Sequence, residues 1–357
     1  METINHSFPW LELIDLPAFC VKNGAIVAAN SPAEQRLLRV GTDIREIVTE
    51  HREAYETFES GTLYLTIRVC ELPCPASVTR MQDCDIFRIH RDGDDGSLQV
   101  LALAAMQLRV PLTNVMTVTD RLFSSLESDD SEVRKQTSQI NQNLYRLLRI
   151  ISNMSDAYSH LSTGSAGMQT ADLSAVIAEI IEKAQAVFTD TNIRLQYSGL
   201  NAPVYGLADT EKLERAIYNL LSNAVKFSQA GSTVNAVLAR NGNQLSFTVC
   251  NTTAEDLTEF SLWQRYRREP AIEDPRHGLG LGMTLISAVA SLHGGTVLVD
   301  HPTAGETRVT MTIPIVKETS GNLRSPVLRI SDYAGGRDTG LLELSEILSA
   351  DVYEKIN

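Results

Sequence analysis

Two stretches between residues 97 and 161 repeat mostly apolar side chains at alternating steps of four and three residues. In the first stretch the repeat runs over Leu101, Ala105, Leu108, Leu112, Val115, Thr119, Leu122 and Leu126. In the second it runs over Ile140, Leu144, Leu147, Ile151, Met154, Tyr158 and Leu161. This heptad spacing predicts two helices, each with an apolar seam. Two helices alone cannot bury both seams, so the pattern favours a homodimer that closes a four-helix bundle over a helix pair packed on a neighbouring domain.

Shorter apolar runs separated by turn residues predict a small α/β unit in the first part of the chain. The predicted elements are a strand at 18–22, a hairpin turn at Asn23-Gly24, a strand at 25–30, a helix opened by Ser31 and Pro32, and strands at 63–69 and 84–91. This order of elements resembles a PAS sensor domain. Asn30 occupies a position where such domains often carry an asparagine.

The remaining patterns complete a multidomain α+β organisation. A Gly/Ser-rich linker at 162–169 leads to a unit of alternating helices and strands. The last forty residues contain glycine, proline and the short amphipathic stretch LLELSEIL, and are expected to be a weakly structured tail that docks on something. The expected units are a sensor-like domain over 1–96, a helical hairpin over 97–163, an α/β unit over 170–316 and a tail over 317–357.

The stretch 209–228, DTEKLERAIYNLLSNAVKFS, predicts an amphipathic helix opened by an aspartate cap. Asn219, Asn223 and Lys226 fall on a separate face from its apolar positions. Amide oxygens can bind Mg²⁺ and a lysine can bind phosphate, so this face suits a nucleotide with its metal. Taken alone, an ordinary solvated face explains these three residues better.

A second stretch, HGLGLGMTLISAVASLHGG at 277–295, places three glycines before an apolar helix. Glycines at a helix N-terminus let backbone N–H groups approach phosphate. The spacing differs from that of the dinucleotide fingerprint. A strand with alternating side chains follows at 307–314.

Together and in this order, these stretches resemble the ATP-binding domain of sensor histidine kinases, which has the Bergerat (GHKL) α/β-sandwich fold. NLLSNAVKFS resembles the N box of that family, FSLWQRYRR at 260–268 its F box, and GLGLGMTLI followed by SLHGG its second glycine box. The resemblance implies ATP and Mg²⁺ as cofactors, with Asn223 as the metal ligand. The implied nucleotide-binding residues are Asn219, Asn223, Lys226, Asn251, Gly278, Leu279, Gly280, Leu281, Gly282 and Thr307.

The chain departs from this family at the adenine contact. Asn251 stands where the family has an aspartate, and Thr253 stands where it has a glycine. A neutral amide is a weaker hydrogen-bond acceptor than a carboxylate, so ATP binding is expected to be weakened. Asn219 also differs from the glutamate base of topoisomerase and chaperone ATPases with this fold, which speaks against that hydrolytic class.

The segment MQLRVPL at 106–112 aligns with the phosphoacceptor motif H-E-L-R-T-P-L of sensor kinases. Met106 replaces the nucleophilic histidine, and a thioether cannot form the phosphoramidate. Gln107 replaces the acid and Val110 replaces the polar residue that positions water, so neither can act in proton transfer or hydrolysis. His90 and His160 flank the helices, but neither lies in a matching context.

Composition and charge narrow the class further. A net charge of −13 argues against nucleic acid or an anionic membrane as the main partner. No apolar run reaches the length of a membrane span and no signal peptide is recognisable, so a cytoplasmic location is expected. Cys20 and Cys250 are expected in cores. The cluster Cys70, Cys74 and Cys84 matches no standard zinc spacing, so burial is favoured over metal binding.

Two functions from different classes fit these observations. The first is a two-component sensor kinase that phosphorylates a histidine, in itself or in a partner. The second is a non-catalytic scaffold or regulator, derived from a kinase, that binds nucleotide and a partner protein. A response regulator is the candidate partner in either case. Residue chemistry at Met106 favours the second for this chain's own helices.

Overall fold

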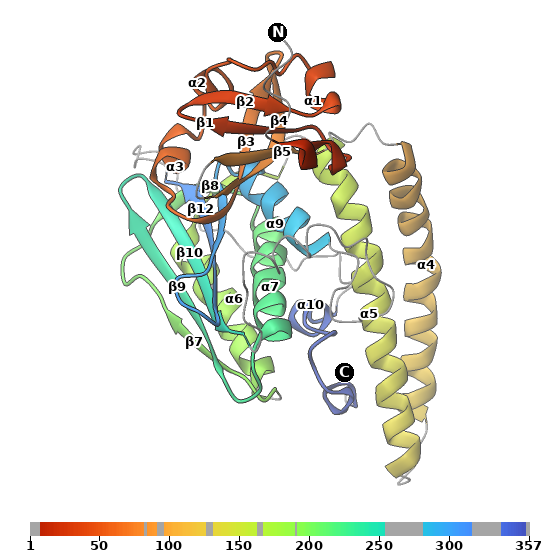
Figure 1. Cartoon of the computed structure of the whole chain (residues 1–357). Helices are drawn as coiled ribbons and strands as arrows, with labels where there is room; N and C mark the ends of the chain where they lie inside the picture. Colours follow the sequence, from red (N-terminus) through yellow and green to blue (C-terminus); the bar gives the residue numbers. More distant parts are fainter. Residues whose placement is uncertain are drawn as a thin grey trace.

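The computed structural model describes residues 8–81, 84–90, 96–125, 131–162, 167–189, 191–253, 281–315 and 337–354 (Figure 1). Within these residues the protein is a mixed α/β structure with one large sheet. The ten strands of this sheet follow the order β2-β1-β5-β4-β3-β11-β12-β10-β9-β7. Among the same residues, no helix combines the length and the apolar content needed to cross a bilayer.

The first half of the sheet belongs to the sensor-like unit. Its elements are η2 (Pro9–Leu13), β1 (Ala18–Lys22), β2 (Ala25–Ala29), α1 (Ser31–Gln35), α2 (Ile44–Ile47), α3 (Arg52–Thr57), β3 (Gly61–Val69), β4 (Leu72–Arg80) and β5 (Asp85–Ile89). The predicted hairpin turn is confirmed, since Asn23 and Gly24 both have positive φ, at 53° and 78°. Strand β4 was not predicted, because Pro73 and Pro75 disfavour a strand with neighbours on both sides.

Asn30 connects the N-terminal loop of this unit to strand β1 and helix α1 through hydrogen bonds. Its side chain is fully buried, and its Oδ1 accepts hydrogen bonds from the backbone N–H groups of Ala18 at 2.9 Å and Ala33 at 3.1 Å. Its Nδ2 donates to the carbonyl oxygens of Ile14 at 2.9 Å and Leu16 at 2.8 Å. One side chain therefore caps helix α1 and ties the preceding loop to strand β1.

The five cysteines differ in how far they are buried. Cys20 is buried, as predicted, whereas Cys250 is only half-buried. Cys70 is exposed, Cys74 is buried and Cys84 lies between these extremes. The described residues contain no group of three or more histidine, cysteine or acidic side chains placed to hold a metal ion.

The two long helices are present, as α4 (Gly96–Ser125) and α5 (Ser131–Ser162), and they lie side by side (Figure 1). Pro111 lies inside α4, which continues on both sides of it. Some residues of the predicted apolar seams are buried within the chain, and others are exposed on its surface. Ile151 is buried within the chain, whereas Leu108 and Leu147 are about half exposed, at 56% and 49%.

The second half of the sheet carries three helices on one face (Figure 1). The elements of this second unit are β6 (Gln169–Asp172), α6 (Leu173–Phe188), β7 (Arg194–Ser198), β8 (Tyr205–Ala208), α7 (Thr210–Phe227), β9 (Thr233–Asn241), β10 (Gln244–Thr252), α9 (Leu281–Leu292), β11 (Val297–Asp300) and β12 (Glu306–Pro314). Strands β6 and β8 are not part of the large sheet, and they pair with each other in a separate two-stranded sheet. Helices α6, α7 and α9 share one hydrophobic core with strands β9, β10 and β12. Burial of this apolar surface is the main stabilising contribution.

The two halves meet along one strand pair. Strand β3 pairs antiparallel with β11, with Tyr64 opposite Val297 and Thr62 opposite Val299. Gly61 begins β3 with φ at 90°, and a Cβ there would lie 2.2 Å from the carbonyl oxygen of Val299. Only glycine fits this close approach. The sensor-like unit is therefore joined to the second unit through backbone hydrogen bonds.

The C-terminal residues are better ordered than the sequence indicates. Within the predicted tail, α10 (Thr339–Glu343) and η4 (Ala350–Tyr353) are structured, and Leu342 of α10 and Tyr353 of η4 are buried in the core shared with α6 and α7. The expectation of a weakly structured tail is wrong for residues 337–354. The prediction that the amphipathic stretch docks is confirmed, since Leu342, Leu344 and Leu348 are all buried.

His90 makes the stability of the sensor-like unit depend on pH. Burial and the nearby positive charge of Arg88 lower the pKa of His90 to about 4. The unfolded chain binds this proton below about pH 6.5, while the folded chain does so only near pH 4, so stability falls as pH falls through this window. The variant His90→Gln is expected to lose roughly 2 kcal/mol less stability than the wild type between pH 7.5 and pH 5. Chemical unfolding at both values measures this, and identical losses would contradict it.

Candidate nucleotide site

Helix α7 forms one wall of the candidate site, as the sequence predicts. The Asp209 side chain caps it by accepting a hydrogen bond from the backbone N–H of Lys212 at 3.2 Å. Its apolar face is buried against the sheet. The three predicted polar residues remain on another side, where Asn219 is buried while Asn223 and Lys226 are half-buried.

The glycine stretch approaches this wall at the start of α9. A Cβ at Gly282 would lie 3.5 Å from both amide atoms of Asn223 and 3.7 Å from Oδ1 of Asn219. Two motifs far apart in the sequence are thus brought together. Gly278, Leu279 and Gly280, with the predicted F box at 260–268, lie outside the described residues. Leu281 is the first residue of α9.

Asn251 and Thr307 are paired residues on two neighbouring strands. Strands β10 and β12 are antiparallel neighbours, and their register places these two residues opposite one another. The Asn251 side chain is buried, and its Nδ2 has no hydrogen-bond partner among the described residues. A buried donor without a partner is costly, so this amide is suited to a ligand. The backbone N–H of Thr253 donates to the carbonyl of Gly305 at 2.7 Å and is already used.

A cationic cluster, consisting of Arg149, Arg215 and Lys226, lies beside the predicted phosphate face. Arg149 comes from α5, and its Nη2 donates to Oδ1 of Asn219 at 3.3 Å. The Nδ2 of Asn219 donates to the carbonyl of Arg215 at 2.9 Å. Both ends of the Asn219 amide are therefore engaged within the chain.

The acidic partners of this cluster come from the C-terminal residues. Glu343 contacts Arg149 at 3.4 Å and Arg215 at 3.2 Å, and it is fully buried. Glu346 contacts Arg149 at 3.2 Å and forms an ion pair with Lys226. Burial and the charge of Arg149 lower the pKa of Lys226 to about 8. The sequence indicated neither glutamate as part of the site, although both lie in the LLELSEIL stretch.

The described residues fit a nucleotide with Mg²⁺ in two respects. The amide of Asn223 supplies an oxygen donor of the kind that Mg²⁺ prefers. The unpartnered amide of Asn251 can hydrogen-bond a polar edge of a base. Lys226 would bind a phosphate oxygen if Glu346 did not already neutralise it.

The degenerate phosphoacceptor segment lies on α4, away from α7. Met106, Gln107 and Val110 all fall within that helix, and Gln107 and Val110 are exposed. Helix α5 lies between α4 and the second unit (Figure 1).

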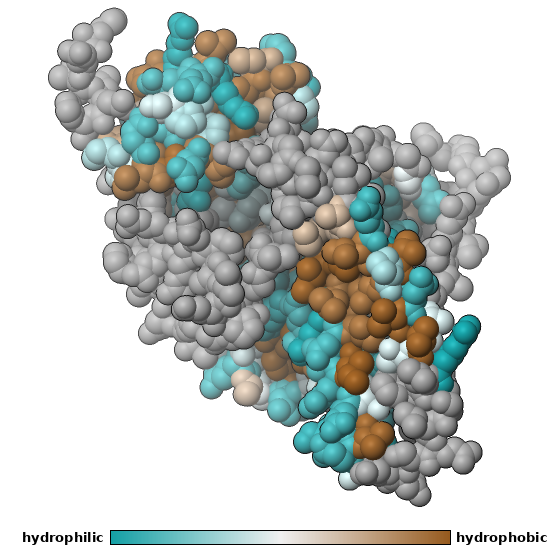
Figure 2. Space-filling model, turned by 90° about the vertical axis from the view of Figure 1, so that its right-hand side faces the viewer, coloured by the Kyte–Doolittle hydropathy of each residue, from teal (hydrophilic) through white to brown (hydrophobic). Residues whose placement is uncertain are grey.

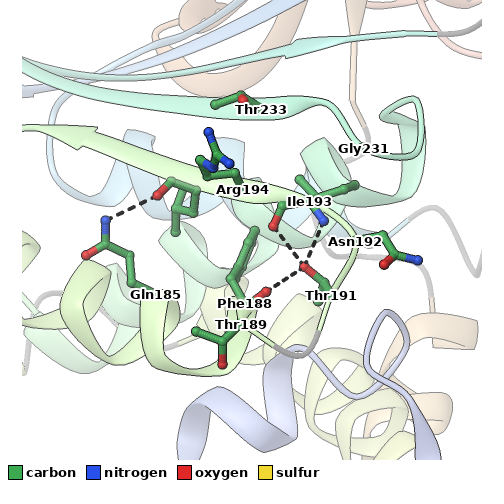
Figure 3. A pocket seen from close by; sticks show the side chains of 10 residues that line it. Gln185, Phe188, Thr189, Thr191, Asn192, Ile193, Arg194, Gly231 and Thr233 are labelled. Carbon is green, nitrogen blue, oxygen red and sulfur yellow. Dashed lines mark hydrogen bonds between the residues drawn. The ribbon is translucent and has the colours of Figure 1, made fainter.

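A separate pocket of about 450 Å³ lies where α6 ends and β7 begins (Figure 3). Several of its polar side chains are engaged within the chain. Thr191 donates to the carbonyl of Phe188 at 2.8 Å, and Gln185 donates to the carbonyl of Leu195 at 3.3 Å. None of the predicted nucleotide-binding residues lines it, so it is not the candidate site.

Comparisons with known proteins show a family match over one part of the chain and weaker similarities over more of it. Residues 208–317 match the family described as histidine kinase-, DNA gyrase B-, and HSP90-like ATPase. This part of the chain is therefore an ATPase domain of the histidine kinase (GHKL) class. Over a longer stretch, the chain is similar to sensor histidine kinases.

The chain is 28% identical over 238 residues to hybrid signal transduction histidine kinase D of Dictyostelium discoideum, covering 62% of this chain and 15% of that protein. It is 29% identical over 279 residues to a sensor-like histidine kinase of Rhizobium meliloti, covering 71% of this chain and 51% of that protein. A structure of full-length ShkA in complex with AMPPNP matches with a TM-score of 0.49 at 20% identity, covering 62% of this chain and 47% of that chain. The chain thus spans about half or less of these proteins.

Proposed function

We propose that this protein is a cytoplasmic, sensor histidine kinase-like signalling protein that binds ATP–Mg²⁺ and does not phosphorylate a histidine of its own. The observation that carries the proposal is the close approach of Asn223 and Gly282, together with the buried Nδ2 of Asn251, which has no hydrogen-bond partner among the described residues. In this proposal Asn223 holds Mg²⁺, Asn251 and Thr307 hold the base, and Lys226 binds phosphate. Residues 1–96 act as a PAS-like sensor domain.

The second candidate function is that of a non-catalytic scaffold or regulator. Met106, Gln107 and Val110 favour it, because the motif keeps the residues that shape the helix and lacks the three that do the chemistry. A response regulator or another signalling protein would be the partner. The ATP-binding domain would then report nucleotide state, or it would phosphorylate a histidine of another protein.

We further propose that the protein forms a homodimer through residues 97–161. The exposed large apolar side chains of α4 and α5 are Leu108, Val110, Val115, Val118, Ile140 and Leu147. Figure 2 shows a hydrophobic patch on the side of the molecule that α4 and α5 form. An apolar patch of this kind on paired helices suits a second copy of the same chain.

Nucleotide binding is tested by thermal unfolding with and without ATP and Mg²⁺. At a hundredfold excess over Kd the bound form gains about 2.7 kcal/mol, so Tm is expected to rise by roughly 5–10 °C. The variant Asn223→Ala is expected to abolish the rise, because it removes the metal ligand. Asn201→Ala, an exposed position in the same domain, is the matched control and keeps it. No rise in the wild type at saturating nucleotide would refute the proposed binding.

A further inference from the structure

The C-terminal segment, residues 337–354, is held by side chains of helix α5. Gln142 donates to the carbonyl of Leu348 at 2.6 Å, and Arg146 donates to the carbonyl of Ser345 at 3.0 Å. The ring of Tyr353 packs on that of Tyr145, with centroids 5.1 Å apart. The segment is thus placed between α5 and the nucleotide-binding domain (Figure 1).

Its two glutamates face the cationic cluster from one side. Glu343 is fully buried between Arg149 and Arg215, whose side chains are only 3% and 5% exposed. Removing one partner of such a buried pair leaves a charge uncompensated, which is strongly unfavourable. Arg149 and Arg215 therefore need an anion, and in this structure the segment supplies it.

Glu346 reaches the proposed phosphate ligand itself. Its carboxylate pairs with the ammonium group of Lys226, and its side chain keeps 26% exposure. A carboxylate and a phosphate group are both oxygen anions that bind lysine and arginine through charge-assisted hydrogen bonds. The docked carboxylate would also repel a phosphate group brought close to it.

We propose that the docked C-terminal segment and the phosphates of ATP–Mg²⁺ are competing ligands of one cationic site, made of Lys226, Arg149 and Arg215. This inference rests on the proposed nucleotide binding. In the docked state Glu346 takes the place of a phosphate group at Lys226. Binding of the nucleotide displaces the segment and transfers Lys226 and Arg149 to phosphate oxygens. Displacement also uncovers the surface of α5 around Gln142 and Arg146.

The test compares two glutamate variants of the full chain. Glu346→Gln keeps the shape of the side chain and removes its charge, and it leaves the buried Glu343 in place. It is expected to lower the Kd for ATP–Mg²⁺, measured by isothermal titration calorimetry, about tenfold. Glu354→Gln is the matched control, because Glu354 lies in the same segment and pairs at 3.7 Å with the exposed Arg134. Its Kd is expected to equal that of the wild type.

Hydrogen–deuterium exchange of the wild type gives an independent measurement. The backbone N–H groups of Leu344 and Leu348 donate to carbonyls at 2.9 and 3.2 Å within the docked segment. Their exchange is expected to speed up when ATP–Mg²⁺ is added. Binding with equal Kd in Glu346→Gln and wild type, without faster exchange, would overturn the competition and leave nucleotide binding standing. An absence of binding heat in all three proteins would overturn both proposals.

Discussion

Purified protein incubated with γ-labelled ATP and Mg²⁺ is expected to carry no acid-labile phosphate. The phosphoacceptor position on α4 is Met106, and its thioether cannot form the phosphorus–nitrogen bond of a phosphohistidine. Gln107 follows it, and an amide cannot take the proton that the nucleophile must lose. Electrophoresis under alkaline and acidic conditions, followed by detection of the label, measures the outcome. Labelling is expected to be absent altogether, because the histidine nitrogen that would bind the phosphoryl group is missing at Met106.

The matched variant restores the motif by changing Met106→His, Gln107→Glu and Val110→Thr together. Gln107 and Val110 are exposed, so these two changes leave the core intact. Acid-labile label that appears only in this variant would show that the ATP-binding domain is a working kinase without an acceptor in its own chain. A variant without label would favour the non-catalytic function. Acid-labile phosphate on the wild type would contradict the prediction, and peptide mapping would then decide between His90 and His160.

Local sequence signals were sufficient to predict most of the individual helices, strands and turns. Helix α7 was predictable, because its aspartate cap and its apolar face obey rules that act within a few residues. The turn at Asn23-Gly24 was predictable for the same reason, since the two residues favour positive φ. Strand β4 was missed, because Pro73 and Pro75 contradict its local pattern while its neighbours β3 and β5 still pair with it.

The long-range contacts could not be predicted in the same way. Strand β3 joins β11 by backbone hydrogen bonds, which any two strand edges can form, so no residue type marks the pairing. The contact of Arg215 with Glu343 spans 128 residues, and each side chain alone resembles an ordinary surface charge. Asn219 was assigned to phosphate by family resemblance, whereas the structure engages it with Arg149.

The candidate site therefore divides according to the origin of its residues. Asn223, Gly282, Asn251 and Thr307 come from motifs of the ATPase domain, and the structure brings them together in two pairs. Arg149 and Glu346 come from outside that domain, one from α5 and one from the C-terminal segment. The site residues that belong to the family motifs are the ones that could be predicted from the sequence. Arg149 and Glu346 could be assigned to the site only from the structure, which places α5 and the C-terminal segment beside the ATPase domain.

The double variant Leu108→Glu/Leu147→Glu is expected to be monomeric under conditions in which the wild type is a dimer. Both leucines are about half exposed in the single chain, one on α4 and one on α5, the two helices whose side of the molecule shows a hydrophobic patch in Figure 2. Burial of a leucine contributes about 1.5–3 kcal/mol, and a symmetric dimer buries four of these side chains. Replacing them with glutamates removes this contribution and brings like charges together, so Kd is expected to rise more than about a thousandfold. Sedimentation equilibrium measures the change.

The control for this prediction is Leu72→Glu, which adds the same charge at an exposed leucine of strand β4, 64% exposed and far from the helical pair in the sequence. It is expected to leave the dimer unchanged. Circular dichroism of the double variant should match the wild type, because neither leucine belongs to the core of the single chain. Ile151, which shares the heptad pattern with Leu147, is buried within the chain, so its replacement would damage the fold and could not test the interface. A double variant with the mass of the wild-type dimer would show that the exposed patch serves another partner.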